Sequence, residues 1–283
     1  MTRVAILGAG GLLGAHLVDL LQKSGREVVR FDRKACDISD RSAVERALSE
    51  VGAVINCAAF TNVDRAESET AAAFAANGIG AELVGTVAAK RKLRAVHIST
   101  DFVFDGKKTT PYDERDKPAP VSAYGKSKLD GEVRFAAVCP SGAIVRVQGL
   151  YGRGGGNFAS KLPELLAAKK ALKLDNERKV QPTWAGAAAQ QLVAILDADV
   201  SGLVHLSCAG SATWADFTRR LVERMNLDVA FEEVGSDALS APAARPPNCL
   251  FDHRVLREKG LMQMPTWEEA QDAFLADRRP TMA

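Results

Sequence analysis

The chain has 283 residues, with 37 Lys or Arg against 35 Asp or Glu, and 47% of its residues are apolar. That apolar share is enough for a substantial core and excludes a wholly disordered chain. The formal net charge of +2 comes without a long basic block, so we expect no nucleic-acid partner. No apolar run approaches the ~20 residues that a membrane span needs, so we expect no membrane partner either.

The start of the chain and its cysteines indicate a cytoplasmic protein. A secretory signal has a basic start, a longer apolar stretch and a cleavage site, whereas here the run Val4–Leu7 leads directly into a glycine cluster. The five cysteines are scattered and form no Cys-x-x-Cys pair. We therefore expect them to be small buried residues of a reduced protein, and we expect no metal site.

The first half of the chain alternates strand-length apolar runs with longer helical stretches. The predicted strands are Val4–Leu7, Glu27–Phe31, Ala53–Asn56, Ala95–Ser99 and Ala143–Arg146. The predicted helices between them include Leu12–Lys23, Thr70–Lys90 and Ala123–Ala137. Runs that are apolar throughout indicate a sheet buried on both faces, with parallel strands joined by helices. The pattern predicts an α/β fold with a doubly wound parallel sheet of the Rossmann type, whose ligand lies at the carboxyl ends of the strands.

After about residue 150 the pattern changes. Helices are predicted at Asn157–Lys170, Ala185–Leu196 and Thr213–Met225, with a strand at Leu203–Leu206 and a proline-rich loop at Ala241–Pro247. We therefore expect a dinucleotide-binding domain at 1–150 and a smaller C-terminal, mainly substrate-binding lobe at 151–283. Some later segments, at about 180–215, are expected to return to the first domain.

A glycine-rich turn follows the first predicted strand directly. Gly8, Gly11 and Gly14 form a G-x-x-G-x-x-G motif with a strand before it and a helix after it. Glycine accepts unusual φ angles and lets backbone N–H groups approach a pyrophosphate at the positive end of the helix. This context favours a dinucleotide site, which includes Leu12 and Leu13, over a turn that binds nothing.

Charged side chains follow the second predicted strand. Asp32 stands where a carboxylate can accept hydrogen bonds from the adenosine ribose hydroxyls, which favours NADH. Arg33 could instead pair with a 2′-phosphate, which favours NADPH, so the preference between the two cofactors stays open. The other residues expected to line the cofactor are Asp37, Ile38, Cys57, Ala58 and Ala59.

The most informative residues are Thr100, at the end of the fourth predicted strand, and Tyr124 and Lys128 on the next predicted helix. Residues four apart on a helix lie on one face, and a neighbouring ammonium lowers the pKa of a phenol from ~10 towards neutrality. We expect Tyr124 to deliver a proton and Lys128 to tune it and to hold the nicotinamide ribose. We expect Thr100 to hydrogen-bond the substrate oxygen. A lone Tyr-x-x-x-Lys is often a chance surface feature, but here it follows the glycine turn in order.

Together these residues resemble the dTDP-4-dehydrorhamnose reductase family of extended short-chain dehydrogenases/reductases. The resemblance covers most of the chain, and its most specific block is Thr100-Asp101-Phe102-Val103-Phe104-Asp105-Gly106. It implies an NAD(P)H-dependent reductase of a nucleotide-linked 4-keto-6-deoxy sugar in dTDP-L-rhamnose synthesis, with Thr100, Tyr124 and Lys128 as the catalytic set. It also implies a set of substrate-side residues, namely Val63, Asp64, Phe102, Phe104, Asn157, Gln181 and Thr183. Some relatives use Mg²⁺ at a dimer contact, so a homodimer and Mg²⁺ are open expectations.

The chain departs from the family pattern on the substrate side. Where the family reads Arg-Thr-Ser-Trp-Val-Tyr-Gly, this chain has Arg146-Val147-Gln148-Gly149-Leu150-Tyr151-Gly152, and Gln181 replaces the usual Gly before Pro-Thr. The aromatic side chain expected to line the sugar pocket is absent, which removes a stacking surface. The sequence therefore predicts reductase chemistry and leaves the keto sugar open.

Two other functions stay open on the same scaffold. One is a sugar-nucleotide epimerase or dehydratase with tightly held NAD, although dehydratases usually carry Asp-Glu after the strand-end Thr and Phe102 follows Asp101 here. The other is a non-catalytic NADP-binding regulatory subunit like that of methionine adenosyltransferase. The intact Thr100, Tyr124 and Lys128 favour an enzyme over such a subunit.

Overall fold

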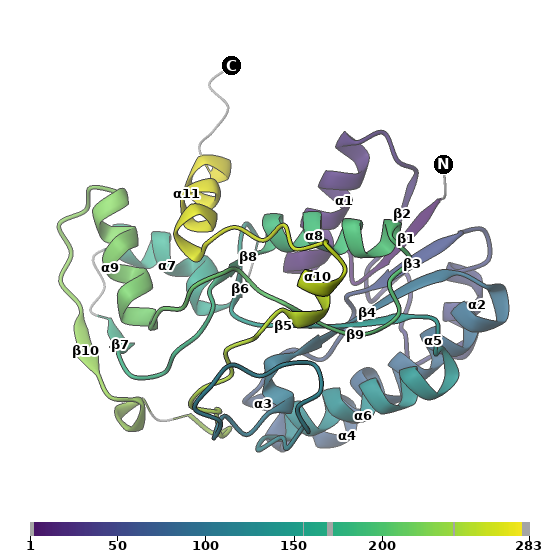
Figure 1. The fold of residues 1–283 in the computed structure, drawn as a ribbon, viewed down its shortest axis with the longest axis horizontal. Helices are drawn as coiled ribbons and strands as arrows, with labels where there is room; N and C mark the ends of the chain where they lie inside the picture. Colours follow the sequence, from purple (N-terminus) through teal and green to yellow (C-terminus); the bar gives the residue numbers. More distant parts are fainter. Residues whose placement is uncertain (1–2, 155, 169–171, 240, 279–283) are drawn as a thin grey trace.

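The computed structural model describes residues 3–154, 156–168, 172–239 and 241–278. Its centre is a six-stranded parallel sheet with the order β2-β1-β3-β4-β5-β9 (Figure 1). The strands are β1 (Val4–Leu7), β2 (Val28–Phe31), β3 (Ala53–Asn56), β4 (Arg94–Thr100), β5 (Ala143–Val147) and β9 (Gly202–Leu206). The chain moves outward from β1 in both directions, so the sheet is doubly wound and the predicted α/β fold is confirmed.

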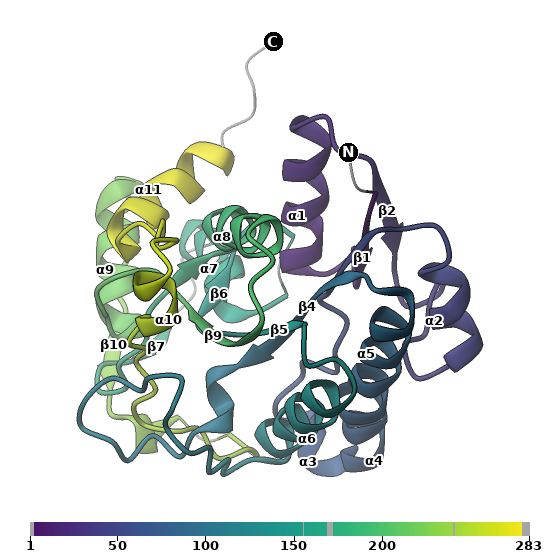
Figure 2. The same ribbon diagram turned by 45° about the vertical axis from the view of Figure 1, so that its right-hand side comes forward.

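Helices cover both faces of this sheet (Figure 2). On one face α1 (Leu12–Lys23) packs against α8 (Ala185–Asp197). On the other face α5 (Gly80–Arg91) packs against α2 (Arg41–Ala47) and α6 (Ala123–Val138). Successive residues of β1 alternate between two apolar cores, since Val4 and Ile6 belong to one and Ala5 and Leu7 to the other. Burial on both faces explains why β1 is apolar throughout.

The remaining elements connect and extend this core. In chain order they are α3 (Arg65–Ser68), α4 (Thr70–Phe74), the π-helix Ala75–Ile79, the 3-10 helix Asp101–Val103, β6 (Leu150–Tyr151), α7 (Phe158–Ala167), β7 (Lys173–Asp175), β8 (Thr183–Trp184), α9 (Trp214–Arg224), β10 (Glu232–Val234), the 3-10 helix Ser236–Ala238, α10 (Arg254–Glu258) and α11 (Trp267–Arg278). β7 pairs with β10 and β6 pairs with β8, each as a separate two-stranded sheet. The end of the predicted helix at Asn157–Lys170 lies outside the described residues.

The second half of the chain contributes to the large sheet as well. β9 forms its edge beside β5, and α8 packs on α1. Residues 185–206 therefore lie with the first domain rather than apart from it. The division into a domain at 1–150 and a lobe at 151–283 stays a prediction.

The predicted helix at Thr70–Lys90 is interrupted by the π-helix between α4 and α5. Two glycines, Gly78 and Gly80, weaken the α-helix here. α6 also approaches so closely that a Cβ on Gly131 would lie 2.0 Å from the Asn77 carbonyl oxygen. The helical stretch Thr70–Arg91 is long and apolar enough to cross a membrane, but more than half of its most apolar part is buried inside the fold. That burial is typical of a core helix.

Candidate active site

The glycine-rich turn lies where β1 meets α1, beside the end of β3. Gly8 has a φ of +76°, a conformation that favours glycine, and a Cβ there would lie 2.7 Å from the Ala58 backbone nitrogen. A Cβ on Gly14 would lie 2.3 Å from the Gly8 carbonyl oxygen. Gly11 caps the 12-residue α1 without a side-chain hydrogen bond. The turn therefore presents backbone N–H groups at the positive end of a helix, as a pyrophosphate site requires.

Asp32 and Arg33 stand next to this turn, directly after β2. A Cβ on Gly10 would lie 3.8 Å from Asp32 Cβ, and an Asp32 carboxylate oxygen accepts from the Ala35 backbone nitrogen at 2.9 Å. The Arg33 side chain is 89% exposed, and its Nε lies 4.0 Å from the Asp37 carboxylate. Both groups proposed for the adenosine ribose are thus accessible beside the glycines.

The other predicted cofactor residues divide into accessible and buried ones. Cys57, Ala58 and Ala59 are partly exposed directly after β3, and Leu12 is partly exposed at the start of α1. Asp37 accepts from the Ser39 backbone nitrogen at 3.0 Å and from its hydroxyl at 2.6 Å, and these bonds hold the pKa of Asp37 below its usual range.

Leu13 and Ile38 are core residues, and their expected role at the cofactor stays a prediction. Leu13 is 6% exposed in the core under α1, and Ile38 is 5% exposed in the core on the other face of the sheet. Both side chains are apolar and gain more from burial than from contact with a charged dinucleotide. They can offer a cofactor backbone groups but little side-chain surface.

Thr100, Tyr124 and Lys128 come together at the carboxyl end of β4. Thr100 is the last residue of β4, and the other two lie on α6, one turn apart. The side chains of Tyr124 and Thr100 are hydrogen-bonded to each other. The Lys128 side chain is buried, and its Nζ donates to the Ile98 carbonyl at 2.7 Å. The Phe102 ring meets the Tyr124 ring edge-on, with centroids 5.5 Å apart.

The predicted lowering of the Tyr124 pKa by Lys128 is wrong for this arrangement. Burial raises the pKa of Tyr124 to about 12, the Thr100 hydrogen bond opposes the rise, and the Asp101 carboxylate adds to it. Lys128 donates to a backbone carbonyl instead, and burial lowers its own pKa to about 8. Tyr124 therefore keeps its proton at neutral pH, which is the form that a proton donor needs.

Asp101 joins this cluster although no sequence pattern marked it as catalytic. Thr100 Oγ1 donates to Asp101 Oδ1 at 2.9 Å and accepts from the Phe102 backbone nitrogen at 3.2 Å. Burial raises the pKa of Asp101 to about 7. Perturbed carboxyl groups beside reactive hydroxyls are typical of functional sites. Its position directly after Thr100, in the most specific sequence block, is the signal that could have identified it.

Asn77, in the π-helix, connects the loop after β3 to the helix that carries Tyr124. Its Oδ1 accepts from the Phe60 backbone nitrogen at 2.8 Å, and its Nδ2 donates to the Phe60 carbonyl at 3.1 Å and to Ser127 Oγ at 2.9 Å. Ser127 Oγ in turn donates to the Tyr124 carbonyl at 2.8 Å. A π-helix inside a longer helix is often found at functional sites, and the Asn-Gly-Ile-Gly run was its signal in the sequence.

Four of the predicted substrate residues are accessible. Val63, Asp64 and Phe102 are partly exposed, and Asn157 is exposed. Asp64 is held by Arg245, whose guanidinium donates to the two carboxylate oxygens at 3.1 and 3.0 Å. Asn157 caps α7, because its Oδ1 accepts from the Ser160 backbone nitrogen at 2.8 Å.

Phe104, Gln181 and Thr183 are buried, and their expected place beside the sugar stays a prediction. Phe104 is 0% exposed and stacks on Tyr112 with ring centroids 4.0 Å apart. Thr183 is 0% exposed and donates to the Gln181 carbonyl at 2.9 Å, while Gln181 is 5% exposed. The aromatic ring packs with other apolar groups, and the polar groups find their partners inside the fold.

The two departures from the family pattern contact each other. Gln148 Nε2 donates to Gln181 Oε1 at 3.0 Å, and the Gln181 backbone nitrogen donates to Gln148 Oε1 at 2.9 Å. Gln148 Nε2 also donates to the Cys249 carbonyl at 2.8 Å. Gly149 has a φ of +56°, and a Cβ there would lie 2.8 Å from the Gln181 carbonyl oxygen. Gln148, Gly149 and Gln181 thus form one packed unit.

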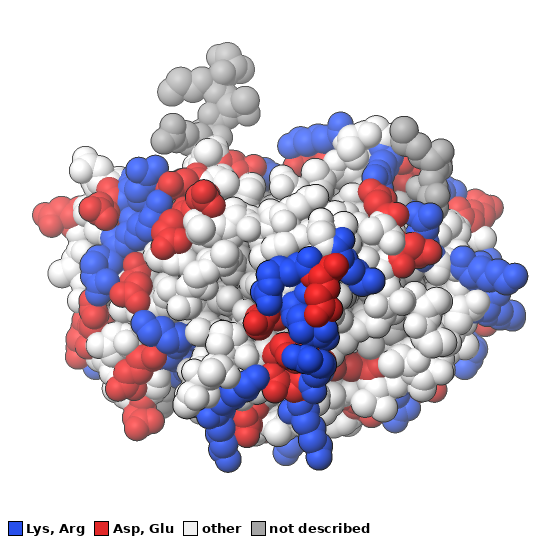
Figure 3. Space-filling model, viewed as in Figure 1, with Lys and Arg blue, Asp and Glu red and all other residues white. Residues whose placement is uncertain are grey.

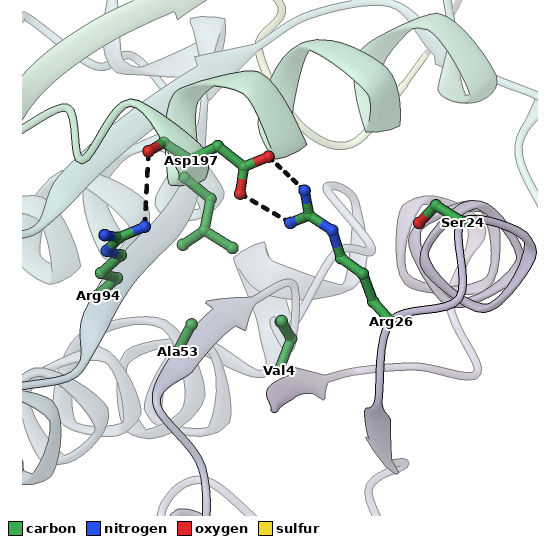
Figure 4. Close-up of a pocket in the computed structure, with 7 residues that line it drawn as sticks. Val4, Ser24, Arg26, Ala53, Arg94 and Asp197 are labelled. Carbon is green, nitrogen blue, oxygen red and sulfur yellow. Dashed lines mark hydrogen bonds and ion pairs between the residues drawn. The ribbon is translucent and has the colours of Figure 1, made fainter. Parts of the chain in front are cut away.

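A cavity of about 370 Å³ lies at the opposite end of the large sheet. It is lined by residues at the amino ends of the strands, among them Val4, Ala53 and Arg94 (Figure 4). Arg26 donates to the Asp197 carboxylate at 2.7 Å, and Arg94 donates to the Asp197 carbonyl at 3.5 Å. Ligands of open α/β sheets bind at the carboxyl ends of the strands, so this cavity is separate from the catalytic cluster.

Charges of both signs are mixed on the surface. On the face seen in Figure 3, Lys and Arg side chains are interleaved with Asp and Glu. Many of them pair, as Arg219 does with Asp216 at 3.0 Å. In the described part of the chain, no group of three or more His, Cys, Asp or Glu side chains is placed to hold a metal ion.

Comparison with known proteins identifies the family. Residues 2–279 match the family described as the RmlD substrate binding domain. The chain is 36% identical to a dTDP-4-keto-6-deoxy-D-glucose reductase of Streptomyces niveus over 95% of this chain and 94% of that protein. It is 35% identical to a dTDP-4-dehydrorhamnose reductase of Mycolicibacterium smegmatis over 97% of this chain and 85% of that protein.

A solved structure agrees with these matches. The dTDP-4-dehydrorhamnose reductase of Bacillus anthracis, crystallised in complex with NADP, superposes with a TM-score of 0.94 at 33% identity, over 98% of this chain and 99% of that one. The fold, the full-length relatives and the family match therefore agree. The chain belongs to the RmlD substrate-binding-domain family.

Proposed function

We propose that this chain is an NAD(P)H-dependent reductase of a nucleotide-linked 4-keto-6-deoxy sugar. The observation that carries the proposal is the cluster of Thr100, Tyr124 and Lys128 at the same edge of the sheet as the glycine turn. Relatives with 35 to 36% identity, matched over 95 to 97% of this chain, are named as reductases of dTDP-linked keto sugars. We take the substrate to be a dTDP-linked sugar with a ketone at C4, and dTDP-L-rhamnose synthesis to be the process it serves.

The residues present fit a dinucleotide. The turn at Gly8 and Gly14 has no room for side chains, and the N-terminus of α1 has no side-chain cap, so its N–H groups can donate hydrogen bonds to a pyrophosphate. Asp32 and Arg33 stand beside the turn for the ribose or its 2′-phosphate. When bound, the reduced nicotinamide supplies the hydride for a carbonyl carbon.

The roles of the catalytic side chains follow from their protonation and contacts. Tyr124, with a pKa of about 12, donates its phenolic proton to the ketone oxygen. Lys128, with a pKa of about 8, is mostly charged at neutral pH and can hold the nicotinamide ribose through its N–H groups. The Thr100 hydroxyl donates its one proton to Asp101, and it would turn that proton from the carboxylate to the substrate oxygen when a sugar binds.

This arrangement favours an enzyme over a non-catalytic regulatory subunit. A subunit that only bound NADP would have no need of a phenol, a hydroxyl and a buried ammonium brought together at one point. A UDP-glucose 4-epimerase of Thermus thermophilus shares the fold with a TM-score of 0.81, but at 18% identity that likeness concerns the fold alone. A cytoplasmic location and a homodimer stay predictions.

The direct test is to follow NADPH and NADH oxidation with a panel of 4-keto sugar nucleotides that vary in base and sugar. We expect turnover with at least one dTDP-linked 4-keto-6-deoxy sugar and free exchange of the coenzyme during gel filtration. Failure to oxidise either coenzyme with every member of the panel would refute the reductase. Coenzyme retained through gel filtration, together with epimerised product, would instead identify an epimerase.

A further inference from the structure

We propose that Glu132 is a positioning residue for the reduction. Its buried carboxylate, held by Arg146, fixes the end of β4 that carries Thr100 against the catalytic helix, one turn from Lys128. The proposal rests on the proposed function, because it concerns the same Tyr124–Lys128 site. Glu132 lies on α6 one helical turn after Lys128, and its side chain is only 6% exposed.

The Glu132 carboxylate is held on both oxygens. Arg146 Nε donates to Oε1 at 2.8 Å, and Arg146 Nη2 donates to Oε2 at 2.6 Å. Ser99 Oγ donates to Oε1 at 2.5 Å. The Arg146 guanidinium lies over the Phe104 ring, 4.9 Å from its centroid, and is itself 2% exposed. A bidentate ion pair that is this deeply buried has a fixed geometry, since neither partner can turn to solvent.

This ion pair completes a series of bonds between β4 and α6. Each of the last three residues of β4 is hydrogen-bonded to a side chain of α6. The pairs are Ile98 with Lys128, Ser99 with Glu132, and Thr100 with Tyr124. Because the middle pair is anchored by Arg146 on β5, it sets the spacing of the two flanking pairs, which contain the three catalytic side chains.

The same carboxylate is the anionic neighbour of Lys128. The titratable groups that interact with this ammonium are Glu132 on α6, His97 on β4 and Cys57 after β3. Burial raises the pKa of Cys57 to about 12 and lowers that of His97 well below its usual value, so both are neutral at neutral pH. Tyr124 is neutral as well. Glu132 thus supplies the negative charge that opposes the loss of the Lys128 proton.

The test uses two variants with opposite charge effects. Glu132→Gln removes the negative charge and is expected to lower the pKa of Lys128 by roughly one pH unit. Arg146→Met leaves the carboxylate without its partner and is expected to raise that pKa. The pKa is followed by ¹³C NMR of the lysine side chains, assigned with Lys128→Met. The alkaline limb of kcat/KM for a 4-keto sugar nucleotide is expected to move in the same two directions.

A merely structural role would weaken both variants without moving the titration in opposite directions. Shifts of the same sign, or an unmoved Lys128 titration, would overturn the proposal. The matched control is Asp130→Asn, on the same helix, whose carboxylate pairs with Arg134 at the surface and whose loss should leave the limb in place. The NMR titration needs no turnover, so it tests the effect of Glu132 on Lys128 even if the wild type reduces no sugar. The absence of sugar reduction would refute only the proposed function.

A milder variant covers the case in which the charge variants do not fold. Ser99→Ala removes one hydroxyl from the series between β4 and α6 and leaves the ion pair intact. We expect kcat to fall roughly tenfold, because Thr100 loses its spacing from Tyr124, while the Kd of NADPH is unchanged. An unchanged kcat in this variant would overturn the positioning role.

Discussion

Burial of the Lys128 ammonium should make the stability of the protein depend on pH. Burial lowers the pKa of Lys128 from its ordinary 10.5 to about 8. Between these two values the unfolded chain keeps the proton and the folded chain releases it, so the free energy of unfolding rises with pH. Each full unit contributes about 1.4 kcal/mol. The wild type should therefore gain roughly 2–3 kcal/mol relative to Lys128→Met between pH 7 and pH 10.

The assay is urea unfolding of the wild type, Lys128→Met and a control at several pH values in this range. The control is Lys126→Met, which removes an exposed lysine from the same helix. Subtracting each variant from the wild type cancels the titration of all other groups. We expect the difference to grow with pH for Lys128→Met and to stay constant for Lys126→Met. A difference for Lys128→Met that does not vary with pH would refute the lowered pKa of a buried Lys128.

Three further changes test other parts of the site. Tyr124→Phe should lower kcat by at least about 100-fold with an unchanged Kd for NADPH, since only the donated proton is lost. Steady-state rates measure kcat, and a coenzyme titration measures the Kd. An unchanged kcat would contradict the assigned role. Arg33→Ala should raise the KM for NADPH about tenfold and leave the KM for NADH unchanged, because the exposed guanidinium is placed for a 2′-phosphate. An equal rise in KM for both coenzymes would argue against this role. Gln148→Ala should lower the free energy of unfolding by about 1–3 kcal/mol, because the Gln181 N–H and the Cys249 carbonyl lose their partner. Urea unfolding measures this loss. An unchanged free energy of unfolding would show that water replaces the Gln148 side chain.

Much of the fold could be predicted because its strands are buried on both faces. The run Val4–Leu7 is apolar throughout and Ala53–Asn56 is apolar up to its last residue, and the observed strands have the same bounds. β7 and β10 are short and partly polar, so no apolar run marks them. The π-helix at Ala75–Ile79 depends on contact with α6, which a helical pattern read along the sequence does not contain.

The catalytic cluster could be predicted for a similar reason. Parallel strands end at one edge of the sheet, so Thr100 and the glycine turn had to lie on the same side, and the four-residue spacing places Tyr124 and Lys128 on one helix face. The direction of the Tyr124 pKa shift could not be predicted, because it depends on burial and on the hydrogen bond that Lys128 donates to the Ile98 carbonyl.

The substrate side was harder to predict because its contacts are long-range. Position in a family motif says nothing of exposure, and Phe104 and Thr183 proved to be fully buried. Asp64 is paired with Arg245, 181 residues further along the chain. The contact between Gln148 and Gln181 also joins distant segments, so two separate departures from the family pattern are one change in the packed structure.

Transfer of hydride to C4 of the sugar, with Tyr124 as proton donor, can be measured most directly with NADPH carrying deuterium at the reactive nicotinamide position. A dTDP-linked 4-keto-6-deoxy sugar is incubated with the protein, and the product is analysed by NMR and mass spectrometry. We predict one deuterium on C4 of the reduced sugar with the wild type and almost no product with Tyr124→Phe. Oxidised coenzyme with no deuterium at C4, or equal product from the two proteins, would contradict the mechanism.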